Sequence, residues 1–123
     1  MIQTAGMPKP GGHYSPCVEH GGLLYVSGQL PMDRESGQVP DGIEAQTKQA
    51  LSNFENILKE AGSRKDLVIS MRVYISNGEH WGKVNQIYAE FFGDHRPARA
   101  VIPTRELHYG SLLEIEGIAA VTG

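Results

Sequence analysis

Several features that define large classes of proteins are missing from this 123-residue sequence. It has a single cysteine, Cys17, so no internal disulfide can form, which is typical of a reducing compartment. Neither the cysteine–histidine spacing of a zinc site nor a glycine-rich phosphate-binding motif occurs. No apolar run approaches the length of a membrane span, and the first residues lack the pattern of a signal peptide. We therefore expect a cytoplasmic protein that uses no metal and no cofactor.

Basic residues are also scarce. The chain has 11 Lys and Arg against 14 Asp and Glu, a formal net charge of -3, and no run of basic residues. This charge argues against nucleic acid or an anionic membrane as the partner. The length predicts one domain over residues 1–123, because neither a repeat nor a linker interrupts it.

The first half of the chain begins with a predicted β-hairpin. Residues 17–20 and 23–27 are two short, largely apolar segments that flank Gly21 and Gly22, a pair suited to a tight hairpin turn. Residues 30–39 contain a turn and predict a further short β-ribbon.

Apolar residues that recur every three or four positions predict two amphipathic helices. The first runs from Gly42 to Gly62, about five turns at 3.6 residues each, with Asp41 as its N-cap. The second covers residues 81–92 and is closed by Gly93.

Strands are predicted between and after the helices, over residues 67–75, 97–103 and 112–121. Period-two alternation assigns Ile69, Met71, Val73 and Ile75 to the helix-facing side of the sheet. The same alternation assigns four apolar residues to the opposite side: Val68, Tyr74, Val101 and Ile118.

The order of elements predicts an α+β fold, a mixed sheet of about six strands with two helices packed on one face. Two helices cover only one face of such a sheet, and the other face is also partly apolar. We therefore expect a second copy of the chain to cover it, which makes the protein a homo-oligomer.

Arg99 is the main candidate for a functional residue, because it lies in the middle of a short, largely apolar strand. A buried guanidinium needs an anionic partner. One alternative is an internal ion pair with Glu114 or Glu116 of the last strand. The other is a bidentate clamp on the carboxylate of a ligand, for which Arg is better suited than Lys.

The remaining candidates are weaker when each is considered alone. Glu114 and Glu116 share one face of a central-looking strand, so at least one of them is expected to be partly buried and to transfer protons. Four further residues could bind a ligand, but packing, a turn or solvation explains each of them equally well: Tyr14, Ser27, Gly28 and Asn85. The aromatic residues of the second helix, Trp81, Phe91 and Phe92, are predicted to be core.

Five segments taken together, in this order along the chain, resemble the RidA (YjgF) family of imine deaminases: residues 25–31, 46–51, 84–92, 97–99 and 113–119. The resemblance implies a chorismate-mutase-like fold and a homotrimer with sites at the subunit interfaces. It implies hydrolytic deamination of small enamine or imine intermediates, of the 2-iminobutanoate and 2-iminopropanoate type, to 2-keto acids and ammonia without a cofactor.

The resemblance also implies roles for particular residues. Arg99 matches the arginine that holds the substrate carboxylate, and Glu114 matches the acidic residue near the hydrolytic water. Four further residues match positions that line the site: Tyr14, Ser27, Gly28 and Asn85. Val101 stands where many members have cysteine, so only its backbone carbonyl could hold water there.

Two other departures from the family pattern concern the wall of the pocket. His13 replaces a proline, and the link from Phe92 to Pro97 is shorter than usual. An alternative function for the same cleft is non-catalytic binding of small carboxylate metabolites by a regulator. Nucleic-acid cleavage is a weaker third reading, because the chain is acidic.

Overall fold

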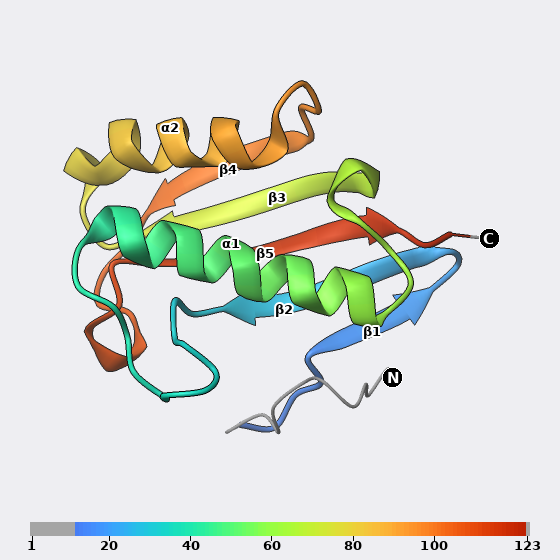
Figure 1. Ribbon diagram of the computed structural model, residues 1–123, viewed down its shortest axis with the longest axis horizontal. Coiled ribbons are helices and arrows are strands. Elements are labelled where there is room, and N and C mark those ends of the chain that lie inside the picture. Colours follow the sequence, from blue (N-terminus) through green and yellow to red (C-terminus); the bar gives the residue numbers. More distant parts are fainter. Residues whose placement is uncertain (1–11, 123) are drawn as a thin grey trace.

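The computed structural model describes residues 12–122 and confirms the α+β class, with two helices and a mixed sheet (Figure 1). The elements are β1 (Cys17–His20), β2 (Leu23–Gln29), α1 (Ile43–Glu60), β3 (Val68–Ile75), α2 (Trp81–Phe92), β4 (Ala98–Pro103) and β5 (Leu113–Ala120). Short 3-10 turns cover Lys65–Leu67, Gly78–His80 and His108–Gly110. No helix within residues 12–122 is long and apolar enough to cross a membrane.

The sheet of the described residues has five strands in the order β1-β2-β5-β3-β4, one fewer than the expected number of about six. Only β3 and β4 are parallel to each other, and the other neighbours are antiparallel. The ribbon expected over residues 30–39 is wrong, because this segment is made of turns and irregular backbone. Asp33 folds it locally, since its Oδ1 accepts hydrogen bonds from the backbone of Glu35 and Ser36.

The ends of α1 confirm one predicted signal and correct another. Gly62 follows the helix with φ of +82°, a left-handed conformation that glycine adopts without strain. Asp41 is not the N-cap: the cap is Gly42, whose φ of 87° turns the chain into the helix without a side-chain hydrogen bond. Glycine at this position supplies the turn that the aspartate was expected to stabilise.

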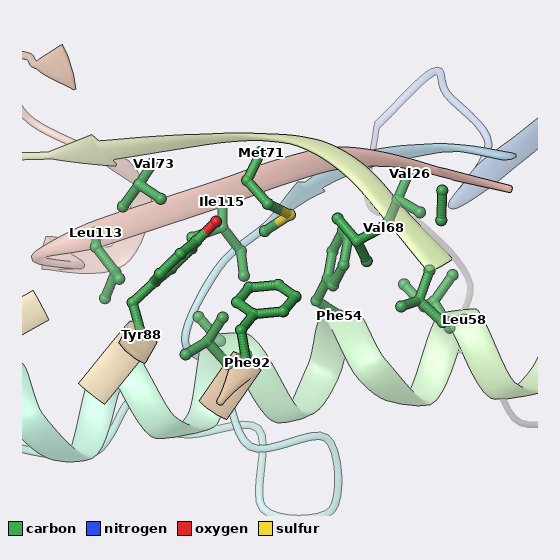
Figure 2. Packing of buried hydrophobic residues seen from close by; sticks show 14 of the residues in the cluster. Val26, Phe54, Leu58, Val68, Met71, Val73, Tyr88, Phe92, Leu113 and Ile115 are labelled. Atoms are coloured by element: carbon green, nitrogen blue, oxygen red, sulfur yellow. The ribbon is translucent and has the colours of Figure 1, made fainter. Parts of the chain in front are cut away.

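The hydrophobic core lies between the helices and one face of the sheet (Figure 2). Phe54 and Leu58 of α1 and Phe92 of α2 pack against this face, and all three are buried. Trp81 was expected in the core but is 48% exposed, because it begins α2 and its ring lies near Arg99. Phe91 is half-buried at the edge of the same core.

Three predicted face assignments are wrong. The register of β3 against β5 shifts between Val68 and Ser70, so Val68 enters the core and Ile69 is 47% exposed. Val101 is paired with Val73 in a parallel register and packs on the core side as well. The open face of the sheet therefore carries fewer apolar residues than expected, although Tyr25 on that face is 42% exposed.

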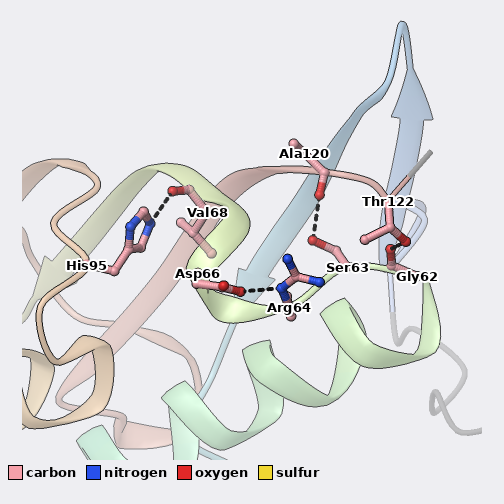
Figure 3. A network of polar contacts seen from close by, with 8 residues as sticks. All are labelled: Gly62, Ser63, Arg64, Asp66, Val68, His95, Ala120 and Thr122. Carbon is pink, nitrogen blue, oxygen red and sulfur yellow. Dashed lines mark hydrogen bonds and ion pairs between the residues drawn. The ribbon is translucent and has the colours of Figure 1, made fainter.

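Polar contacts hold the segments that follow α1 and α2 against the end of β5 and the start of β3 (Figure 3). Ser63 Oγ donates to the carbonyl of Ala120 at 2.6 Å, which ties the end of α1 to the end of β5. His95 Nε2 lies 2.7 Å from the carbonyl oxygen of Val68. This second contact anchors the link between α2 and β4, and so helps to set where Arg99 begins to project from the sheet.

Candidate functional site

Arg99 projects from β4, an edge strand, toward one face of α2. Its Nη1 donates a hydrogen bond of 2.8 Å to Asn85 Oδ1. Its Cζ lies 4.8 Å from the ring centroid of Tyr88 and 5.9 Å from that of Trp81. Residues 81, 85 and 88 fall on one side of a helix, so a single helical face contacts the guanidinium. The sequence expectation of a buried guanidinium is wrong, because Arg99 is exposed at the sheet edge.

The internal ion pair considered for Arg99 is absent from the described residues, where its only hydrogen-bond partner is neutral. Glu116 instead accepts a hydrogen bond of 2.7 Å from Tyr74 Oη and lies 3.5 Å from Arg72 Nη1. The guanidinium keeps most of its five N–H donors, since Asn85 takes one. Arg99 is thus able to bind an external carboxylate.

Glu114 is half-buried on the opposite face of the sheet from the core. Burial raises its pKa above the ordinary value; the Glu116 charge also raises it, while nearby His108 lowers it. Its carboxyl group lies against Gly28 of β2, where an added Cβ would come 3.0 Å from Glu114 Cδ. A half-buried carboxylate with a raised pKa is suited to exchanging protons with a substrate or water.

Ser27 and Tyr14 lie near the same end of β2. Ser27 Oγ donates a hydrogen bond of 2.6 Å to the carbonyl of Ser15, and its backbone N–H donates to the carbonyl of Pro16 at 3.0 Å. The hydroxyl hydrogen of Ser27 is therefore engaged, and only its oxygen remains to accept a bond. Tyr14 is 54% exposed.

The candidate site residues that the structure shows fall into two groups within one chain. The arginine cluster consists of Trp81, Asn85, Tyr88 and Arg99, on the α2 side of the β4 edge. The glutamate cluster consists of Gly28 and Glu114, which meet on the open face of β2 and β5, together with Ser27, which precedes Gly28 in β2. Strand β3 separates β5 from β4, so one chain does not bring Arg99 to Glu114.

Sequence reasoning missed two members of the arginine cluster and one neighbour of Glu114. The apolar pattern assigns Tyr88 and Trp81 to the core, although their spacing from Asn85 already places all three on one helical face. No signal in the sequence connects His108 to Glu114, because it is the turn before β5 that brings the two together.

No group of three or more His, Cys, Asp or Glu side chains within residues 12–122 is placed to hold a metal ion. The fold and these two clusters define a small α+β domain. It presents an arginine that has no carboxylate partner in the described part of the chain and, separately, a half-buried glutamate with a raised pKa.

Comparison with known proteins agrees with this class. The family model described as endoribonuclease L-PSP matches residues 4–121. The chain is 42% identical to the 2-iminobutanoate/2-iminopropanoate deaminase of Rattus norvegicus over 120 residues, 97% of this chain and 88% of that protein. It is 41% identical to a Lactococcus lactis protein named as a candidate regulator, AldR, over 98% of this chain and 97% of that protein.

A solved structure of Escherichia coli TdcF with bound serine superposes with a TM-score of 0.92 at 30% identity, covering 99% of this chain and 98% of that chain. The protein therefore belongs to the RidA (YjgF) family, the family of the matching endoribonuclease L-PSP model.

Proposed function

We propose that this protein hydrolyses small 2-imino acids, and the enamines in equilibrium with them, to 2-keto acids and ammonia. The observation that carries the proposal is the Arg99 guanidinium, which Asn85 and Tyr88 hold in place without a carboxylate partner among the described residues. The name of the rat relative and the serine bound to TdcF support a small substrate with a carboxylate.

The chemistry requires little of the protein, because the carbon of a C=N bond is already electrophilic. Arg99 binds the carboxylate and orients the C=N bond. Glu114 accepts a proton as water adds to that carbon, and then returns a proton to nitrogen so that ammonia leaves and the 2-keto acid forms. One water is consumed and no oxidant is needed.

We further propose that each complete site lies between two copies in a homotrimer. Arg99, Asn85 and the Val101 backbone would come from one copy, and the glutamate cluster with Tyr14 from the next. This proposal is supported by the separation of the two clusters within one chain and by the partly apolar open face of the sheet.

The proposal is tested by generating an imino acid in the assay, with an amino-acid oxidase acting on alanine or 2-aminobutanoate, in the presence of semicarbazide as a competing trap. The wild-type protein should reduce the trapped product, and Arg99→Ala should not. If Arg99→Ala clears the imine as fast as the wild type, the assignment of Arg99 is wrong.

Regulation by binding alone is the second candidate, because a relative of similar identity is named as a candidate regulator. Glu114→Gln separates the two functions. Loss of turnover with unchanged binding of 2-oxobutanoate supports the enzyme, whereas binding without turnover in the wild type supports the regulator. The nuclease named by the family model is disfavoured by the net charge of -3.

A further inference from the structure

Tyr88 is fixed between the core and the guanidinium of Arg99. Its side chain points from α2 toward the sheet, beside Phe92 (Figure 2), and the two ring centroids are 4.8 Å apart. The residue is 7% exposed, while its ring lies 4.8 Å from Arg99 Cζ. A rigid aromatic face therefore lies beside a charged group at the exposed edge of the sheet.

Arginine at an edge strand is ordinarily free to adopt many rotamers, and a ligand must then select one of them. Here two contacts restrict the side chain. Asn85 Oδ1 accepts one N–H, and the Tyr88 ring attracts the cation within the distance at which cation–π contacts are effective. The hydrogen bond fixes one edge of the guanidinium, and the ring restricts the rest of the group.

We propose that Tyr88 is a positioning residue for the carboxylate site, and that its ring holds Arg99 in the orientation that receives the substrate. This inference rests on the proposed function, because it assigns a partner to the arginine that binds the carboxylate. Tyr88 acts through Arg99 and does not itself touch the substrate.

The ring, rather than the hydroxyl, is the acting part of Tyr88. The hydroxyl oxygen is buried and has no hydrogen-bond partner within residues 12–122. Burial raises the pKa of Tyr88 to about 12, so the phenol is neutral near pH 7. A phenylalanine at this position would keep the aromatic face and lose only an unpaired hydroxyl.

The experiment compares Tyr88→Phe, Tyr88→Leu and the wild type. The dissociation constant of 2-oxobutanoate is measured by calorimetry, and kcat and KM are measured in the imine assay. Tyr88→Leu should weaken binding and raise KM by about three- to tenfold, the range expected for one cation–π contact. Its kcat should fall by a smaller factor than KM rises, because the Arg99–carboxylate contact already forms in the ground state.

Tyr88→Phe should bind 2-oxobutanoate and turn over the imine like the wild type, because it keeps the aromatic ring beside Arg99. The matched control is Phe54→Leu, an aromatic-to-aliphatic change at a buried position of α1. It should lower thermal stability without changing the dissociation constant. The NMR signals of the Arg99 δ-methylene protons report directly where this side chain lies relative to residue 88. The ring current of residue 88 should shift these signals in the wild type and in Tyr88→Phe, and Tyr88→Leu should lose this contribution.

Two results would overturn the inference in distinguishable ways. If the wild type binds 2-oxobutanoate and Tyr88→Leu binds it equally well, Tyr88 has no positioning role and the proposed function stands. If the wild type neither binds 2-oxobutanoate nor clears the imine, while its Arg99 signals still show the ring-current shift, the proposed function fails and the role of Tyr88 fails with it.

Discussion

The carboxyl group of Glu114 lies directly against the backbone of Gly28, so residue 28 limits where this carboxylate can be. A methyl group on Gly28 would come within 3.0 Å of Glu114 Cδ and would displace the side chain. Gly28→Ala should therefore lower kcat by about ten- to a hundredfold, the cost of misplacing a catalytic group by about 1 Å. Binding of 2-oxobutanoate, which depends on Arg99, should remain nearly unchanged.

Gly78→Ala is the control for this change, because a Cβ at that position meets nothing within 4 Å. Its kcat should equal that of the wild type. If Gly28→Ala also has the wild-type kcat, the carboxyl group of Glu114 takes no part in the reaction.

The pH dependence of kcat should report the state of Glu114. The group must be ionised to accept a proton, and its pKa is raised from the ordinary value of 4.5, mainly by burial. The rate should therefore rise with pH through a pKa above 4.5. Removing the Glu116 charge with Glu116→Gln should move this limb to lower pH, and His108→Ala should move it to higher pH. Shifts in the opposite directions would contradict the influence of Glu116 and His108 on the pKa of Glu114.

The same pKa has a consequence for stability. Because the folded state holds the Glu114 proton more tightly than the unfolded state, the stabilising contribution of this group is complete below the unfolded pKa. It is lost as pH rises through the raised folded pKa. Glu114→Gln should therefore be at least as stable as the wild type near pH 7, and urea unfolding at pH 4 and pH 7 measures the difference.

Asn85 offers a separate test of the arginine clamp. Asn85→Asp keeps an oxygen acceptor for Arg99 Nη1 but adds a negative charge beside the incoming carboxylate. It should weaken 2-oxobutanoate binding more than Asn85→Ala, which removes only the hydrogen bond. Calorimetric titration of the two variants measures the order. Equal or tighter binding by Asn85→Asp would show that the ligand is not an anion held by Arg99.

Gly117 of β5 tests the packing of the fold rather than the chemistry. A Cβ at this position would meet Phe54 Cζ at 2.8 Å and the backbone oxygen of Ser70 at 2.9 Å. Gly117→Ala should lower the free energy of unfolding by about 1–3 kcal/mol, as expected for overpacking a core. Urea denaturation measures this loss, and a variant as stable as the wild type would show that the helix–sheet contact is looser than these distances indicate.

Regular periodicity made much of the fold predictable from the sequence. The hairpin around Gly21, the two amphipathic helices and the strand of Arg99 all depend on local spacing, and the structure has them. The faces of β3 and β4 were less predictable. A shift in strand register places Val68 in the core, and the parallel pairing of Val73 with Val101 places both on the core side.

The candidate site was predictable as a set of residues and not as an arrangement. Arg99 and the pair Glu114 and Glu116 could be selected from the sequence, because charges within apolar strands need an explanation, and the family resemblance then singled out Glu114. Their distance from each other depends on strand order, which the sequence pattern does not state. The contact of Arg99 with Tyr88 depends likewise on how α2 packs over the edge of the sheet.

The central claim is that Arg99 of one copy and Glu114 of another complete one site, and mixing two inactive variants tests it. Arg99→Ala and Glu114→Gln, co-expressed with different tags and purified as mixed assemblies, should form some interfaces with both residues intact. Each purified mixed trimer has one intact interface of three, which predicts recovery of about a third of the wild-type activity. Arg99→Ala mixed with Asn85→Asp, both in the arginine cluster, is the control, and it should recover no more than the residual activity of either variant alone. No recovery in mixed assemblies of Arg99→Ala and Glu114→Gln would contradict a site shared between two copies.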